Sequence, residues 1–284
     1  RINDLATARH AISSQIVDMV GMTRGHIADP YIVEKLMRGD ESRIRSCVGA
    51  TYCSNFGYCI QSPATAREST LPHRIETNGQ KQKKVVVVGG GPGGLEAARV
   101  CASRGHRVVL FEAADKVGGQ VLLAGKIGWR KDLNGIIHWL ENECRLLGVE
   151  LRFNHFAEAA DVKNENPDVV IVATGGSPHT DWVTGNASII SSWDILSGMV
   201  MLSGSVFVHD LTGRNTAMAV ADLLSEKGVQ VTLNTQDAHI GAEAMRLEMS
   251  PFMKRFYERG VAMSVDQELI SAHAEDKQTR VTVL

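Results

Sequence analysis

The pattern of apolar and polar residues along the chain predicts alternating strands and helices. Short apolar runs suit buried parallel strands, whereas apolar residues three and four positions apart mark one face of a helix. The central region shows both patterns, with strands expected at 85–88, 108–112, 150–154 and 168–173 and helices at 93–103 and 133–147. We expect the strand at 168–173 to be buried. This order is typical of a doubly wound α/β sheet.

A second unit repeats the strand and helix pattern towards the end of the chain. Its strands are expected at 206–209, 229–234 and 281–284, and its helices at 215–227 and around the apolar residues Met245, Met249, Phe252 and Phe256. The repetition predicts two Rossmann-like nucleotide-binding domains, at 84–184 and 185–284.

The first part of the chain follows a different pattern. Residues 5–11 are typical of a helix, and the apolar run 16–22 predicts a buried strand. That strand ends in Thr23-Arg24-Gly25, a turn that suits a phosphate group. Asp29-Pro30 then predicts the start of a helix, and Gly39 predicts its end.

Composition and charge narrow the class of protein. The chain is 44% hydrophobic and 22% charged, with 30 basic and 32 acidic residues, as in ordinary globular proteins. This balance gives no indication of a nucleic-acid or membrane partner. No apolar run approaches the roughly 20 residues of a membrane-spanning helix. Five cysteines in 284 residues do not make a disulfide framework, so we expect a reducing, cytoplasmic compartment. Without a starting methionine or a leader, the sequence is interpreted as a fragment or a processed chain.

A glycine-rich turn carries the clearest chemistry. Gly89, Gly91 and Gly94 form Gly-x-Gly-x-x-Gly directly after a run of four valines, and Glu112 ends the next strand. Such glycines let the backbone approach a pyrophosphate, the following helix supplies amide donors, and a carboxylate in the position of Glu112 accepts from ribose hydroxyls. The motif alone is often only a turn. Its place between strand and helix predicts a site for FAD, or at least ADP.

Three cysteines lie close together in a polar loop. Residues 47–66 hold Cys47, Cys53 and Cys59 among Gly, Ser, Asn and Tyr, and residues 67–83 form a polar linker. Thiolates held this close are usual ligands of iron–sulfur clusters or zinc, although three is one short of a complete site. A structural thiol is the alternative for each of them. Cys101 and Cys144 fall on predicted helices and are interpreted as core residues.

The second unit lacks the matching fingerprint. After its first strand the chain reads Asp210-Leu211-Thr212-Gly213-Arg214, in which one glycine remains. The carboxylate of Asp210 would face a pyrophosphate with its own negative charge. We therefore expect the second domain to hold no nicotinamide cofactor.

Further segments resemble the two-dinucleotide flavoproteins. They are the Val117-Gly118-Gly119-Gln120 turn, the basic Arg130 and the strand end Ala173-Thr174-Gly175. The resemblance implies that Gly119, Gln120 and Arg130 approach the flavin nucleotide and that Thr174 and Gly175 mark the crossover between the nucleotide domains. Without the resemblance, Arg130 is interpreted as a surface residue and the glycine pair as a loop.

Longer segments resemble one group of Old Yellow Enzyme-like flavoproteins, that of trimethylamine dehydrogenase and 2,4-dienoyl-CoA reductase. They are 18–24, 28–30, 47–53 and 87–94. The resemblance implies an FMN-binding (β/α)8 barrel, a loop with a 4Fe-4S cluster and two nucleotide-binding domains. Residues 1–46 would then be the end of the barrel, with Thr23 and Arg24 at the FMN phosphate. The catalytic residues would lie in the earlier barrel strands, so none is named here.

Two departures from the group concern the cysteine loop. Ala50 stands where the group has a cysteine, and the segment from Cys53 to Cys59 is short. Residues 47–53 and 111–115, with the altered second nucleotide turn, are most similar to the N-methylproline and dimethylglycine demethylase branch. That similarity implies oxidative N-demethylation of a small N-methylated amine through FMN, with electrons leaving through the iron–sulfur site.

Several partners and alternatives accompany this interpretation. For the intact enzyme we expect a small amine substrate, an electron-transfer protein as acceptor and a homo-oligomer. One alternative is an NAD(P)H-dependent enoate reductase, which the turn after residue 209 argues against. The other alternative is a non-catalytic ADP-binding module.

Overall fold

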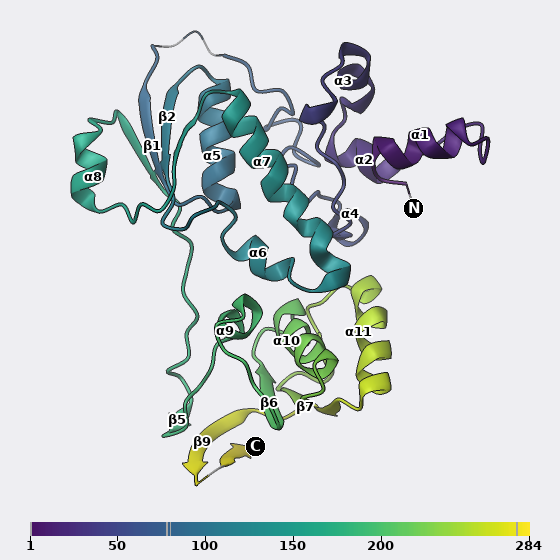
Figure 1. The fold of residues 1–284 in the computed structure, drawn as a ribbon, viewed down its shortest axis with the longest axis vertical. Coiled ribbons are helices and arrows are strands. Elements are labelled where there is room, and N and C mark those ends of the chain that lie inside the picture. The colour runs from purple at the N-terminus through teal and green to yellow at the C-terminus, as the bar shows by residue number, and fades with distance from the viewer. Residues whose placement is uncertain (1, 78, 80, 277) are drawn as a thin grey trace. The chain divides into compact units, whose positions relative to one another are not determined.

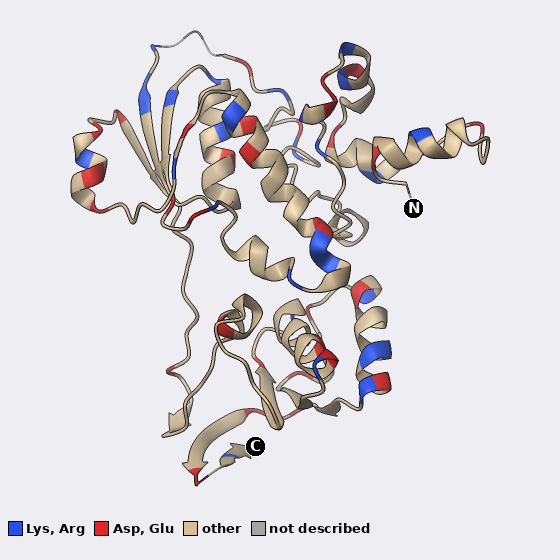
Figure 2. Cartoon of the chain, in the orientation of Figure 1, with Lys and Arg blue, Asp and Glu red and all other residues tan. Residues whose placement is uncertain are grey.

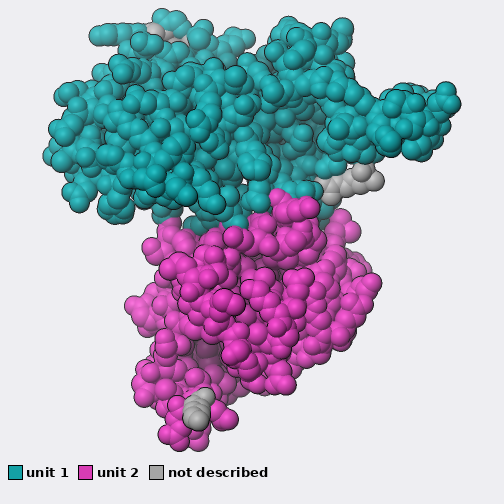
Figure 3. Space-filling view, in the orientation of Figure 1, with its two compact units in different colours: residues 1–122, 132–175 teal, residues 123–131, 176–284 magenta. Residues whose placement is uncertain are grey.

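The computed structural model of this chain describes residues 2–77, 79, 81–276 and 278–284. The chain forms two compact units, one of residues 1–122 and 132–175 and the other of residues 123–131 and 176–284 (Figure 3). The chain therefore passes from one unit to the other three times. Each unit is described by itself. No helix in the described part is long and apolar enough to cross a membrane.

The first unit is built on a four-stranded parallel sheet. The sheet has the order β3-β2-β1-β4, with β1 at Lys84–Val88, β2 at Arg107–Phe111, β3 at Glu150–Arg152 and β4 at Val169–Val172. Helices α5 (Pro92–Ser103) and α7 (Gly135–Leu146) lie side by side against the sheet, and the short helix α8 (Ala159–Asn164) lies apart from them (Figure 1). These elements confirm the strands and helices expected for this region.

Alternate valines of β1 belong to different cores. Val85 and Val87 are buried in a cluster with Leu95 of α5 and Ile137 of α7. Val86 is buried on the other face, with Val109 and Phe111 of β2 as its cluster. Because both faces of a parallel strand are covered, the strand is apolar throughout and shows no alternation.

The prediction that the strand at 168–173 is buried is wrong for β4. Val170 and Val172 are 44% and 73% exposed. β4 is an edge strand that pairs with β1 alone in this sheet. An apolar run indicates a strand of a parallel sheet, but the chain packed around the strand decides how much of it is covered.

The N-terminal part of the first unit consists of short helices joined by loops. They are α1 (Leu5–Ser13), α2 (Thr23–Ala28), α3 (Ile32–Arg38), η1 (Glu41–Arg43) and α4 (Tyr52–Asn55). The expected helices at 5–11 and after Asp29-Pro30 are confirmed, and Gly39 caps α3 with φ of 77°. The linker at 67–83 contains no helix or strand among its described residues; Asn78 and Gln80 lie outside them.

The strand expected at 16–22 is absent, so that prediction is wrong. Ile16 and Met19 are 66% and 84% exposed, and Thr23 begins helix α2 where a turn was expected. A parallel strand is held by hydrogen bonds to neighbouring strands. Residues 16–22 pair with none of the described strands, so the apolar run alone does not form a strand.

The second unit has its own parallel sheet and core. The sheet order is β6-β7-β8, with β6 at Ser205–Asp210, β7 at Gln230–Thr235 and β8 at Ala262–Ser264. Helices α10 (Asn215–Glu226) and α11 (Arg246–Arg259) bury Met218, Phe252 and Phe256 with Leu233 of β7. The strands and helices expected here are confirmed.

A second three-stranded sheet completes this unit. Its order is β10-β9-β5, with β5 at Thr184–Gly185, β9 at Leu269–Glu275 and β10 at Gln278–Val283. β10 confirms the strand expected at the end of the sequence. Helix α9 (Ser192–Ser197) also belongs to this unit, whereas α6 (Gln120–Ala124) and η2 (Gly128–Asn134) each include residues of both units. Basic and acidic residues are mixed along the elements, as on α11 (Figure 2).

Candidate dinucleotide site and cysteine loop

The glycine-rich turn joins β1 to α5 and contains two kinds of glycine. A Cβ added to Gly94 would collide with the carbonyl oxygen of Gly89, and a Cβ added to Gly89, which has φ of 105°, would collide with the carbonyl of Ala173. These two glycines allow the helix and the next crossover to pack against the strand end. Gly91 and Gly93 would meet nothing within 4 Å. The backbone between them is therefore open to a close ligand, as pyrophosphate binding requires.

Glu112 braces this turn from the end of β2. Its Oε2 accepts a hydrogen bond from the amide of Gly90 at 2.7 Å, and its Oε1 accepts from the amide of Ala114 at 2.8 Å. The half-buried carboxylate is thereby held beside the glycine turn. The sequence pointed to Glu112 for ribose binding but not for this bracing contact, because Gly90 carries no polar side chain that would signal a partner.

Two more predicted segments meet the same turn. The amide of Gly118 donates to the carbonyl of Gly90 at 2.9 Å, and a Cβ on Gly119 would lie 3.2 Å from Cα of Gly91. A Cβ on Gly175 would lie 3.6 Å from Nε2 of Gln120. Thr174 is also close, since its Cα lies 3.1 Å from a Cβ built on Gly89. The structure thus brings the turns at 89–94, 117–120 and 173–175 together.

Arg130 has different surroundings. It belongs to the second unit, where its Nη1 lies 3.7 Å from Oε2 of Glu248 and its side chain is 11% exposed. Oε2 of Glu248 also accepts from Nδ2 of Asn215 at 2.7 Å. Arg130 is therefore not a surface residue. Its approach to the flavin nucleotide stays a prediction.

Segment 123–131 is an integral part of the second unit. Leu123 and Ile127 pack into its core cluster. The ring of Trp129 meets that of Phe252 edge-on, with centroids 5.1 Å apart.

The two residues expected at an FMN phosphate lie on helix α2. Thr23 is exposed at the start of α2, and Arg24 is half-buried beside it. Their role at an FMN phosphate stays a prediction.

The cysteine loop contains free thiols in varied surroundings. Cys47, Cys53 and Cys59 are half-buried and free. Burial raises the pKa of Cys59, whereas amide donors from Gln61 and Ser62 and the charge of Arg45 act in the opposite direction. Arg45 is itself 8% exposed, and its buried Nε has no hydrogen-bond partner in the described part of the chain. These donors suit an anionic group in the loop.

The geometry of the thiols does not fit a cluster. Among the residues that the structure describes, no group of three or more His, Cys, Asp or Glu side chains could hold a metal ion. Ala50, which stands where the resembling group has a cysteine, is buried at 7% exposure and offers no ligand.

Cys144 behaves as expected for a core residue, because burial raises its pKa to about 12 and its Sγ lies 3.4 Å from the carbonyl oxygen of Leu95.

Comparison with known proteins decides the family. The model of a family described as pyridine nucleotide-disulphide oxidoreductase matches residues 83–284. The chain belongs to this oxidoreductase family. The match includes both parallel sheets and the glycine turn, so it confirms an α/β fold with Rossmann-like domains.

Individual relatives confirm the resemblance found in the sequence. The chain is 45% identical over 276 residues to a protein named probable N-methylproline demethylase from Rhizobium meliloti (strain 1021), covering 95% of this chain and 41% of that protein. It is 40% identical over 289 residues to N,N-dimethylglycine/sarcosine dehydrogenase from Chromohalobacter salexigens, covering 96% and 42%. It is 43% identical over 285 residues to the multifunctional alkene reductase/demethylase OYE of Caballeronia cordobensis, covering 100% and 42%. This chain thus spans about two fifths of the length of these relatives.

Two solved structures agree with the fold. The chain matches a 2-naphthoyl-CoA reductase complex with a TM-score of 0.86 and 27% identity, covering 99% of this chain and 43% of that one. Histamine dehydrogenase from Rhizobium sp. 4-9 matches with a TM-score of 0.88 at 23% identity, and supports the fold alone.

Proposed function

We propose that this chain is the dinucleotide-binding part of a flavin-dependent oxidoreductase and that it binds FAD, or ADP, at the turn 89–94. The observation that carries the proposal is the convergence of this turn with residues 117–120 and 173–175 around an open backbone at Gly91. The amides at the start of α5 would bind the pyrophosphate, and Glu112 would accept from the ribose. Gln120 and Thr174 would line the path of the nucleotide.

For the intact protein we propose oxidative N-demethylation of a small N-methylated amine or amino acid, of the N-methylproline or dimethylglycine type. The names of two relatives support this class of substrate. A bound flavin would supply the acceptor for a hydride from the N-methyl carbon, and water would then split the organic iminium into a secondary amine and formaldehyde. The residues of this chain would bind and orient the dinucleotide, and the end of the barrel at 1–46 would contact FMN through Thr23 and Arg24.

Anaerobic stopped-flow reduction of the full-length flavoprotein tests the substrate class. We expect N-methylproline or dimethylglycine to bleach the flavin, and NADPH and NADH to leave it oxidised. Rapid bleaching by a nicotinamide with none by the amines would contradict the demethylase. It would support the alternative enoate reductase, which the name of the alkene reductase/demethylase relative keeps as a second candidate. Chromatography of the nucleotide released on denaturation distinguishes FAD from ADP.

Electron exit through an iron–sulfur site at Cys47, Cys53 and Cys59 rests on the sequence and its resemblance alone, because the described side chains form no metal-binding group. If the site exists, anaerobically prepared full-length protein contains iron and acid-labile sulfide. Cys53→Ser then removes both, whereas Cys101→Ser on α5 keeps them. Absence of iron and sulfide from the wild-type protein would contradict the cluster, and electrons would then leave the flavin by another path.

A further inference from the structure

The loop after β6 occupies the same place in the second unit as the glycine turn in the first. β6 ends at Asp210 and α10 begins at Asn215, and β7 pairs in parallel with β6. In a parallel α/β unit, a dinucleotide pyrophosphate binds between this loop and the helix N-terminus. The two loops can therefore be compared directly for the space and the amide donors that they offer.

In the second unit a carboxylate of the chain already takes the amides of this loop. Asp210 is 2% exposed. Its Oδ1 accepts from the amide of Thr212 at 2.9 Å, the hydroxyl of Thr212 at 3.1 Å and the amide of Gly213 at 3.1 Å. Its Oδ2 is buried and has no hydrogen-bond partner in the described part of the chain. A pyrophosphate would have to displace this carboxylate to reach the same donors.

The space beside the loop is also filled. A Cβ built on Gly213 would lie 2.7 Å from Oδ2 of Asp237 and 3.1 Å from the amide nitrogen of Glu243. That amide donates to the carbonyl of Gly213 at 2.8 Å, which closes the segment onto the loop. The contrast with Gly91 is direct, because a Cβ there would meet nothing within 4 Å.

The charges beside this loop disfavour pyrophosphate binding, as the packing does. Asp210 and Asp237 are close enough that the charge of Asp237 adds to burial in raising the pKa of Asp210. A pyrophosphate carries two negative charges, so it would approach two carboxylates in place of free amides. A buried acceptor can leave its donors only if a new partner satisfies them.

We propose that Asp210 is a built-in anion that excludes nicotinamide dinucleotides from the second unit, with Asp237 and the segment 237–243 closing the space. Asp210 is thus a specificity-determining residue. It decides that electrons reach the flavin from the organic substrate and not from a bound NAD(P)H. The inference rests on the proposed function and deepens it, because it names the residue of the second unit that keeps NADH and NADPH away from the flavin.

Calorimetric titration of the full-length flavoprotein with NADH and NADPH tests the exclusion. Wild-type protein should show no binding up to about 1 mM. The double variant Asp210→Gly with Asp237→Asn frees the amides and removes both charges, so its affinity should rise at least about tenfold. Asp210→Asn keeps an oxygen for the amides but removes the charge, and should show a smaller gain. Asp181→Asn, at an exposed side chain of the same unit, is the charge control and should change nothing.

Each outcome of the titration has a defined meaning. A wild-type dissociation constant below about 100 μM would overturn the proposal. Circular dichroism and flavin content show whether the double variant folds. If it folds and gains no affinity, the proposal is also overturned. If the double variant does not fold, Asp210→Asn decides, because it removes the charge of the side chain that occupies the amides and should still gain affinity. No gain there would equally overturn the proposal. Failure of the amines to reduce the flavin would leave this result unaffected.

Discussion

At the scale of single residues, Glu112 combines two duties. In the proposed site it would accept from the ribose, and in the structure its carboxylate accepts hydrogen bonds from the amides of Gly90 and Ala114. Substitution therefore affects the shape of the turn as well as a ligand contact. A buried donor that loses its acceptor costs about 1–3 kcal/mol.

Glu112→Ala should lose the bound FAD or ADP and lower the free energy of unfolding by about 1–3 kcal/mol. Glu112→Gln keeps an acceptor oxygen for one of the two amides. It should therefore retain more nucleotide and more stability than Glu112→Ala. Chromatography of the denatured protein measures the nucleotide, and urea unfolding measures the stability. Unchanged nucleotide content in Glu112→Ala would remove this residue from the site.

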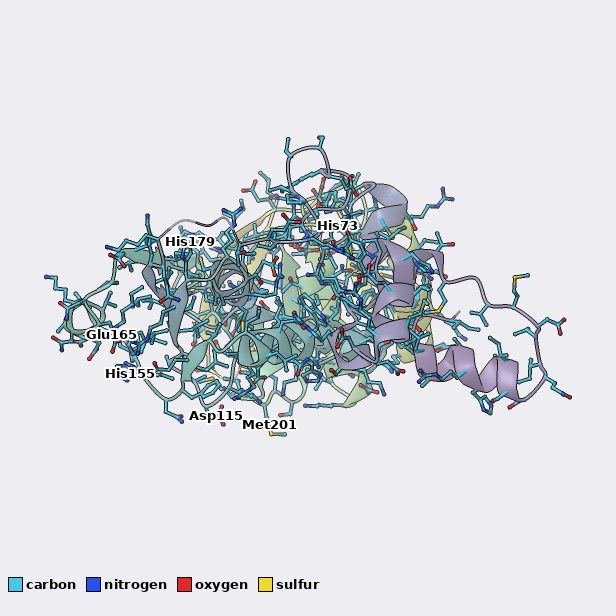
Figure 4. All side chains as sticks on the ribbon, turned by 90° about the horizontal axis from the view of Figure 1, so that it is seen from above. His73, Asp115, His155, Glu165, His179 and Met201 are labelled. Carbon is cyan, nitrogen blue, oxygen red and sulfur yellow. The ribbon has the colours of Figure 1, made fainter. Side chains whose placement is uncertain are left out.

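Glu165 shows how charge stabilises the first unit. Its carboxylate lies 2.8 Å from Nζ of Lys84, at the start of β1, and 2.6 Å from Nη1 of Arg152, at the end of β3 (Glu165 is labelled in Figure 4). Hydrogen bonds with these two residues lower the pKa of Glu165 to about 2. A lowered pKa in the folded chain stabilises the fold above the ordinary value of 4.5, and this contribution is lost as the pH falls towards 2.

Glu165→Gln should therefore lower the free energy of unfolding at pH 7 by about 1 kcal/mol, a value typical of ion pairs near the surface. The difference from wild type should shrink below pH 4.5 and vanish near pH 2. Denaturant unfolding as a function of pH measures it. Glu150→Gln, whose side chain is 46% exposed and pairs with Arg152, is the matched control and should have a smaller effect. A pH-independent difference would refute the ionic origin.

At the scale of elements, the glycine turn separates packing from binding. Gly94 allows α5 to pass the carbonyl of Gly89. Gly91 has open space where a Cβ would be, and its φ of −70° is one that any residue adopts. Substitution by alanine should thus reduce stability at Gly94 and nucleotide binding at Gly91.

Gly94→Ala should destabilise the chain by about 1–3 kcal/mol, because the added methyl group has no room beside the backbone of Gly89. Gly91→Ala should change stability by less than about 0.5 kcal/mol yet abolish nucleotide binding, because its methyl group would occupy the side that a pyrophosphate approaches. Thermal unfolding and nucleotide content measure the two effects. A stable Gly91→Ala variant that retains full FAD or ADP would exclude this side of the turn as the binding surface.

At the scale of the whole molecule, the chain is divided between two units that interrupt each other. Segment 123–131 packs into the second unit although both of its flanks lie in the first. The glycine turn that carries the proposed nucleotide site lies in the first unit. A ligand that binds only the folded state stabilises the body to which it binds.

Added ADP should therefore raise the melting temperature of the first unit. At a concentration of 100 times its dissociation constant, the gain is about 2.7 kcal/mol. NADPH at the same concentration should leave the transition of the second unit unchanged. Differential scanning calorimetry records both transitions, with Gly91→Ala as the control that loses the shift. A shift confined to the second unit would contradict the placement of the site.

The sequence by itself determined the elements whose signals are local. A run of four valines, a glycine turn and a helical stripe are encoded by near neighbours, so β1, α5 and α7 lie where they were predicted. The nucleotide turn was predictable for the same reason. Most of its residues come from one strand–turn–helix, and Glu112 follows on the next strand.

Only the tertiary structure decided the features that depend on distant partners. The run 16–22 forms no strand, because strand hydrogen bonds need neighbours that periodicity does not supply. β4 is exposed because it lies at an edge, and Arg130 meets Glu248 because its segment packs into the other unit. The closure of Gly213 by Asp237 also comes from a later loop. Such contacts join residues far apart in the chain, and their geometry exists only once both have folded.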